Sequence, residues 1–234
     1  MTGTLYGLGV GPGDPELLTL KALRILREVP AIAYPAPEKG DSMTRAIAAA
    51  HLPGGQAEIA LRMPMIAGDA PADAHYDRYV SEIVAHLEAG RDVAVLCEGD
   101  PLFYGSFMYV LIRLEGGHPV EVVPGVSSLT ACAAAAAMPL VSRNETLAVL
   151  PAPLPEEELE ARLVSVHAAA IMKVGRHLPK VRRVLSRLGL EDGARYVERA
   201  CLDGEKVLPL NEVDDGRAPY FSMILVRKGM AAAP

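Results

Sequence analysis

The chain has 234 residues, a formal net charge of −6, and hydrophobic residues at 50% of its positions. This length fits one large domain or two small ones, and the apolar content is enough for a sizeable core. No run of lysine and arginine is present, so a broad nucleic-acid surface is not expected, and the acidic balance argues against RNA as the partner.

The cysteines and the termini exclude several other classes. Cys97, Cys132 and Cys201 are isolated and form no C-x-x-C pair, so we expect neither a disulfide framework nor a metal site. The first residues lack a basic stretch followed by an apolar signal core. The alanine-rich run at 131–137 is far shorter than the roughly 20 residues that span a bilayer. We therefore expect a soluble, cytoplasmic protein.

The first segment predicts a strand over 4–9, followed by a helix that Asp14 caps and that carries leucines from Leu17 to Leu26. The glycines around the strand end resemble a dinucleotide loop, but Pro12 stands where the last glycine of Gly-x-Gly-x-x-Gly would be. The second strand, 31–34, is expected to end in Pro-Ala-Pro instead of an acidic residue that would hold a ribose. Both features disfavour an NAD site.

The stretch around Gly99 is the centre of the predicted fold. The run Val93 to Cys97 is apolar throughout, which is typical of a strand buried on both faces of a parallel sheet. It ends at Glu98-Gly99-Asp100-Pro101, where a ligand is expected, because ligands bind beyond the carboxyl ends of parallel strands. The alternative is an ordinary tight loop between strand and helix.

The rest of the chain predicts two α/β domains, 1–125 and 126–234, the first with a mainly parallel sheet and the second with a mixed one. The loop between residues 68 and 71 is expected to be irregular. Further helices are expected at 42–51, 74–89, 106–114, 129–137, from residue 156, and at 178–188; further strands are expected at 120–123, 146–150, 169–174, 195–200, 206–210 and 221–227.

Four motifs in this order resemble the tetrapyrrole methylase family: G-V-G-P-G-D-P-E-L-L-T, E-G-D-P, V-P-G-V-S-S and M-K-V-G-R-H. The resemblance runs from residue 4 to about residue 229. It implies two αβα domains with S-adenosylmethionine in the cleft between them, a tetrapyrrole substrate, and a homodimer. Within the family, the motifs most resemble enzymes that methylate precorrin-2 at C(20) in cobalamin biosynthesis.

The resemblance also implies a set of cofactor-binding residues, carried over position by position. They are Pro12, Gly99, Asp100, Pro101, Tyr104, Ser127, Ser128, Thr130, Met172, Lys173, Ala200, Cys201, Tyr220, Phe221, Ser222 and Met223. Many relatives have a glycine where this chain has Glu98, which leaves open whether Glu98 faces ligand or solvent.

The chemistry suits these residue types. Bare main chain at glycine and proline corners can hold a sulfonium cation and its carboxylate. Glu98, Asp100 and Tyr104 are candidates for the base that removes a proton from the methylated carbon; Asp100 could instead cap the next helix.

A substrate with many carboxylates needs local cations. The candidates for these are Arg45, Arg62, Lys173, Arg176 and His177. For Arg45 and Arg62, a solvated surface charge is the alternative.

Other functions remain open at this point. They are the cobalt-containing form of the same substrate, another corrin or uroporphyrinogen methyltransferase, diphthine or ribosomal RNA methylation within the same fold, a nucleotide-binding module without turnover, and a dinucleotide oxidoreductase.

Overall fold

The computed structural model describes residues 2–63, 73–114, 116–214, 216 and 218–229. The chain divides into two compact units, Met1–Ser127 and Ser128–Pro234, two residues after the predicted boundary. The loop predicted at 68–71 and the alanine-rich end at 231–234 lie outside the described residues. Within the described ranges, no helix has the length and apolar character needed to cross a bilayer.

Unit 1 has a five-stranded sheet in the order β3-β2-β4-β1-β5, and every neighbouring pair is parallel. The strands are β1 (Leu5–Gly9), β2 (Ala31–Pro37), β3 (Ala57–Met63), β4 (Val93–Cys97) and β5 (Val120–Val123). All five residues of β4 are buried, as its unbroken apolar run predicted. The parallel sheet of the first domain and the central place of this strand are therefore confirmed.

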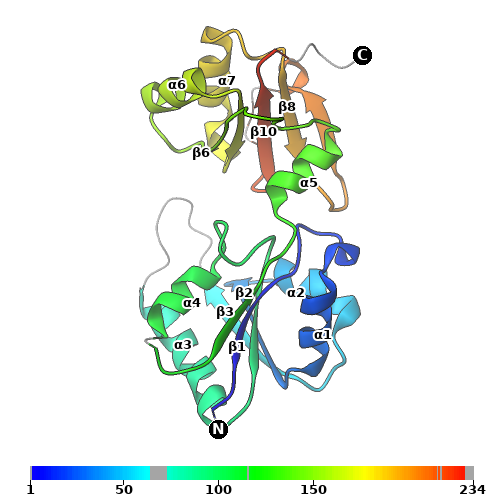
Figure 1. The fold of residues 1–234 in the computed structure, drawn as a ribbon, viewed down its shortest axis with the longest axis vertical. Helices are drawn as coiled ribbons and strands as arrows, with labels where there is room; N and C mark the ends of the chain where they lie inside the picture. The colour runs from blue at the N-terminus through cyan, green and yellow to red at the C-terminus, as the bar shows by residue number, and fades with distance from the viewer. Residues whose placement is uncertain (1, 64–72, 115, 215, 217, 230–234) are drawn as a thin grey trace. The chain divides into compact units, whose positions relative to one another are not determined.

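Helices cover both faces of this sheet (Figure 1). They are α1 (Leu20–Glu28), α2 (Met43–Ala48), α3 (Asp73–Glu88) and α4 (Phe107–Arg113), with short 3-10 turns η1 (Pro15–Leu17) and η2 (Ala49–His51). Side chains of α3 and α4 pack with Val93, Val95 and Cys97 of β4, whereas those of α1 and α2 pack with Ala94 and Leu96. Successive side chains of β4 point to opposite faces of the sheet, so this one strand contributes to the core on each face.

Two details of the first segment differ from the prediction. Asp14 does accept a hydrogen bond from Glu16 N at 2.8 Å, but it caps only η1. Leu18 is extended, and Thr19 caps a separate helix, α1, by accepting from Ala22 N. The prediction of one continuous helix was wrong, because the chain is extended at Leu18 and a new helix begins after Thr19.

Strand β2 is also longer than predicted and continues through Pro35 to Pro37. Its pairing with β4 ends at Ala33, so the prolines lie where no β4 ladder bond is lost. Glu38 follows the strand directly, so the expected absence of an acidic residue at its end was wrong. The departure at Pro12 from the dinucleotide pattern stands.

Unit 2 has a mixed five-stranded sheet in the order β6-β7-β10-β8-β9, which confirms the second part of the predicted fold. Its strands are β6 (Leu147–Pro151), β7 (Ala168–Met172), β8 (Ala194–Glu198), β9 (Lys206–Pro209) and β10 (Ser222–Arg227). Helices α6 (Glu156–Ser165) and α7 (Leu178–Arg187) pack in one core, and α5 (Ser128–Ala135) packs in the other (Figure 1). The short turns η3 (Gly175–His177) and η4 (Leu210–Glu212) complete the unit.

In unit 1 the chain crosses itself at four glycines, Gly9, Gly11, Gly99 and Gly125, which we call the glycine corner. Gly11 and Gly99 form a single antiparallel bridge, in which Gly99 N donates to Gly11 O at 2.8 Å. A methyl group added to Gly9 would lie 2.5 Å from Gly125 N, and one added to Gly125 would lie 2.0 Å from Gly99 O. The three segments can approach this closely because none carries a side chain there.

Replacing Gly125 tests this contact. We expect Gly125→Ala to lower the free energy of unfolding by about 1–3 kcal/mol, because backbone atoms must move to admit the methyl group. Urea unfolding followed by circular dichroism measures the change. Gly216→Ala is the matched control, because a methyl group at Gly216 meets nothing within 4 Å. Equal stability of the two variants would contradict close packing at the glycine corner.

Candidate active site

The glycine corner places four candidate residues, Glu98 to Pro101, at the carboxyl end of the central strand. Val10 N donates to Cys97 O at 2.9 Å, so β1 and β4 stay joined up to the last residue of β4. Gly99 then turns the chain with φ = 66°, a left-handed conformation that glycine adopts without strain. The bridge to Gly11 therefore fastens the end of β4, where Gly99 is buried.

The Asp100 carboxylate clamps two backbone segments. Oδ1 accepts a hydrogen bond from Leu102 N at 2.9 Å, and Oδ2 accepts one from Gly125 N at 3.1 Å. Helix α4 begins at Phe107 with Ser106 in the N-cap position, so Asp100 does not cap it. Each carboxylate oxygen retains a second acceptor site that a cationic ligand could use.

The loop from Pro101 to Gly105 follows this clamp and is tightly turned. A methyl group at Gly105 would lie 2.4 Å from Pro101 O and 2.6 Å from Asp100 O. Tyr104 has φ = 56° and is 47% exposed, and its ring contacts Phe103 edge-on at 5.3 Å between centroids. A non-glycine residue in this conformation is held by its surroundings, a feature that clusters at ligand sites.

The Glu98 side chain points to the α2 side of the sheet. Thr44 Oγ1, which is fully buried, donates a hydrogen bond to Glu98 Oε1 at 2.8 Å. Burial raises the pKa of the Glu98 carboxyl, and the hydrogen bond from Thr44 opposes that rise. Thr44 is a residue that the sequence did not single out, because no local pattern marks it.

In unit 2 the remaining candidates gather at one edge of the sheet. Strands β7 and β8 both run antiparallel to β10, so their carboxyl ends lie beside the start of β10. The register pairs Met172 with Met223 and Glu198 with Ser222. This edge therefore brings together Met172, Lys173, Ala200, Cys201, Tyr220, Phe221, Ser222 and Met223.

Backbone strain concentrates at the same edge. Lys173, Arg199 and Cys201 have φ values of 57°, 56° and 62°. Arg199 N donates to Phe221 O at 2.8 Å, which fastens the two segments together. Tyr220 is 70% exposed, whereas Met223 and Ala200 are buried, so the tyrosine ring offers the accessible apolar surface.

The candidates at the unit boundary occupy the start of α5. Ser128 is its first residue, Thr130 its third, and Ser127 is the last residue of unit 1. Pro12 follows Gly11 of the glycine corner.

Among the cationic candidates, Arg45 already has a partner. Its Nε and Nη2 donate to the two Glu58 oxygens at 2.6 and 2.7 Å, and Tyr34 OH donates to Glu58 Oε2 at 2.6 Å. The hydrogen bonds from Arg45 hold the Glu58 pKa at about 2, below its usual 4.5. This geometry favours a structural role for Arg45, which fastens α2 to β2 and β3.

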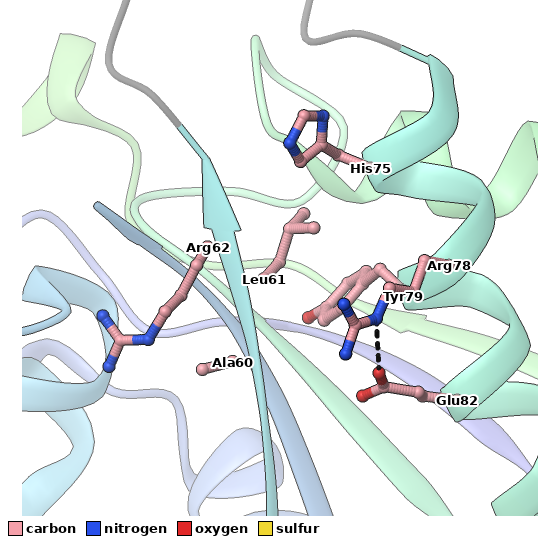
Figure 2. Close-up of a pocket in the computed structure, with 7 residues that line it drawn as sticks. All are labelled: Ala60, Leu61, Arg62, His75, Arg78, Tyr79 and Glu82. Carbon is pink, nitrogen blue, oxygen red and sulfur yellow. Dashed lines mark hydrogen bonds and ion pairs between the residues drawn. The ribbon is translucent and has the colours of Figure 1, made fainter. Parts of the chain in front are cut away.

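Arg62 lines a pocket of about 460 Å³ between β3 and α3 (Figure 2). Figure 2 shows its guanidinium directed away from Tyr79 and Arg78, which line the opposite wall. Nη1 donates to Pro37 O and Gly40 O at 3.1 and 3.2 Å. The pocket is two strands away from β4 in the sheet order, so it is separate from the glycine corner.

Arg176 and His177 lie in η3, just after β7 and Lys173. Arg176 is exposed, and His177 N donates to Val174 O at 2.7 Å. Burial, followed by the charges of Lys180 and Arg176, lowers the pKa of His177, which disfavours the charged ring. Of these two, Arg176 is the better candidate for a substrate carboxylate.

The pairing of Arg45 with Glu58 predicts a pH dependence. Because the folded-state pKa of Glu58 is lowered, its stabilisation is present above pH 4.5 and is lost as the pH falls towards 2. We expect Glu58→Gln to lower the free energy of unfolding at pH 7 by roughly 1 kcal/mol, with a difference from the wild type that shrinks below pH 4.5. Urea titrations from pH 7 to pH 3 measure it.

The matched control is Glu28→Gln, which removes a more exposed pair with Arg24. It should change stability by less than about 0.5 kcal/mol. A Glu58→Gln effect that is as large at pH 3 as at pH 7 would contradict the assigned ion pair.

Comparisons with known proteins place this arrangement in context. The chain is 43% identical over 232 residues to a precorrin-2 C(20)-methyltransferase of Sinorhizobium sp, covering 96% of this chain and 95% of the relative. It is 36% identical to a cobalt-precorrin-2 C(20)-methyltransferase of Salmonella typhimurium, covering 97% and 98%.

A solved structure gives an independent view of the fold. A uroporphyrin-III C-methyltransferase of Thermus thermophilus, complexed with S-adenosylhomocysteine, matches with a TM-score of 0.70 and 27% identity, covering 97% of this chain and 92% of that one. The family model described as "Tetrapyrrole (Corrin/Porphyrin) Methylases" matches residues 4–214. The chain therefore belongs to the tetrapyrrole methylases.

Proposed function

We propose that this protein transfers a methyl group from S-adenosylmethionine to C(20) of precorrin-2, giving precorrin-3A and S-adenosylhomocysteine in cobalamin biosynthesis. The observation that carries the proposal is the 43% identity, along nearly the full length of both chains, to a relative with that name. The cobalt complex of precorrin-2 is the second candidate substrate, because a relative at 36% identity bears that name.

The residues present fit a cofactor of this kind. When bound, S-adenosylmethionine supplies an electrophilic methyl group on a cationic sulfur. The loop after the glycine corner is exposed at Leu102 and Tyr104, and Asp100 offers a carboxylate with spare acceptor sites for an ammonium group. In unit 2, the exposed ring of Tyr220 and the strained backbone at Lys173 and Cys201 are the proposed contacts of the nucleoside.

The remaining assignments complete the proposal. Pro12, Ser127, Ser128 and Thr130 contribute further cofactor contacts, and Arg176 and Lys173 receive substrate carboxylates. Catalysis comes largely from positioning, because methyl transfer to an electron-rich carbon requires alignment of donor and acceptor. We also propose a homodimer in the cytoplasm; an exposed apolar stripe on α4, formed by Met108, Leu111 and Ile112, supports an interface.

The reaction is tested with purified protein, methyl-labelled S-adenosylmethionine and either precorrin-2 or its cobalt complex. We expect one labelled methyl group per macrocycle, located at C(20) by NMR, with one equivalent of S-adenosylhomocysteine. Uroporphyrinogen III in place of precorrin-2 is the control and should receive no label. Absence of label in both precorrin-2 forms would overturn the proposal.

The cofactor site is tested by calorimetry with S-adenosylhomocysteine. We expect Tyr220→Ala to raise the Kd about tenfold, because an aromatic contact with adenine is lost, which corresponds to about 1.4 kcal/mol. Val164→Ala is the matched control: Val164 is 61% exposed, comparable to the 70% of Tyr220, but lies on α6. An unchanged Kd in Tyr220→Ala would remove this residue from the site.

A further inference from the structure

The Glu98 carboxyl is an acidic group that the packing places in partly buried surroundings without a cation. In the described part of the chain, its hydrogen bond from Thr44 at 2.8 Å is the only polar contact, and no Lys, Arg or His lies within ion-pair distance. Burying a carboxylate without a cation costs free energy. A carboxylate held in this state is therefore a candidate for a functional role.

The neighbouring ionisable groups are engaged elsewhere. On α2, Arg45 pairs with Glu58; on β2, the Tyr34 hydroxyl also binds Glu58. His51 of η2 contacts Pro15 O at 3.3 Å. The adjacent Asp100 binds backbone amides, and the Cys97 thiol lies in the core on the opposite face of the sheet, where burial raises its pKa to about 12. None of these groups neutralises Glu98.

Helix α2 is fixed in a way that holds Thr44 against Glu98. Ser42 Oγ donates to Pro35 O at 2.5 Å and accepts from Arg45 N at 3.2 Å, which anchors the start of the helix. The bidentate contact of Arg45 with Glu58 anchors the same turn to β3. Thr44 lies between these anchors and is fully buried, so its hydroxyl has little freedom to turn away.

We infer that Thr44 is a positioning residue, which orients the Glu98 carboxylate as the group that takes the proton from C(20) after methylation. This inference rests on the proposed function. In the step, the C(20)–H bond breaks, its electron pair returns to the conjugated macrocycle, and the proton passes to a Glu98 oxygen, which makes that carboxyl neutral. Glu98 is the candidate base, and Thr44 acts through it.

The electrostatics suit this role. Burial makes the Glu98 carboxylate a stronger base than an exposed one, because its charged form is poorly solvated. The Thr44 hydroxyl donates to the charged form and so opposes the rise in the Glu98 pKa that burial causes. Removing that hydroxyl should therefore raise the midpoint of Glu98 titration further.

The direct test is carbon-13 NMR titration of ligand-free protein labelled at glutamate Cδ, with the Glu98 signal assigned by its absence in Glu98→Gln. We expect the wild-type midpoint above 4.5, a higher midpoint in Thr44→Val, and a wild-type value in Thr44→Ser, which restores the hydroxyl. Thr19→Val is the control: it removes the cap of α1 and lowers stability without moving the Glu98 midpoint.

The second readout is the pH profile of kcat/KM for methyl transfer to precorrin-2. We expect the acid limb of kcat/KM, which reports the free enzyme, to move to higher pH in Thr44→Val by the same amount as the NMR midpoint, and to return in Thr44→Ser. An unmoved NMR midpoint would overturn the role of Thr44. A moved midpoint with an unmoved acid limb would overturn Glu98 as the base.

These outcomes separate this inference from the proposed function. If wild-type protein methylates C(20) but the Thr44 variants titrate or react as the wild type does, the inference fails and the function stands. If no precorrin-2 form is methylated by the wild type, the proposed function fails and the inference falls with it, whatever the NMR titration of Glu98 shows.

Discussion

The site in unit 1 depends on the approach of three backbone segments at the glycine corner. A methyl group on Gly9 or on Gly125 would overlap neighbouring main-chain atoms, among them Gly99 O. The ends of β1, β4 and β5 are thereby joined without side chains, and Asp100 adds a clamp by binding the amides of Leu102 and Gly125. The cost is conformational entropy, which glycine loses on folding more than other residues do. The gain is a closely packed corner at the carboxyl ends of the strands, where Gly9, Gly11 and Gly99 are buried.

Around this corner, polar side chains are fixed mainly to one another and to backbone. Arg45 is held by Glu58, Asp100 by two amides, and Thr44 by Glu98. Arg45, which the sequence offered as a ligand for carboxylates, therefore helps to build unit 1. Fixed partners of this kind keep a site pre-organised, which matters for a reaction whose rate depends on alignment.

Unit 2 also gathers its candidate residues at one edge of a sheet, but that sheet is mixed. Its mixed topology brings the ends of β7 and β8 beside the start of β10, so residues far apart in sequence share one edge. The strained residues Lys173, Arg199 and Cys201 lie at these strand ends, where the paired strands on either side hold them in place.

The sequence by itself determined the two α/β domains, the buried β4, the parallel and mixed sheets, and the family, because apolar runs and glycine–proline corners are local signals. It misjudged the first helix, where Thr19 provides a second cap, and the end of β2, where pairing with β3 carries the strand through two prolines. Tertiary structure alone decided the partners of Thr44 and Arg45, 54 and 13 residues away. Those contacts follow from the order of strands in the sheet, which places β2, β3 and β4 side by side and which no local pattern encodes.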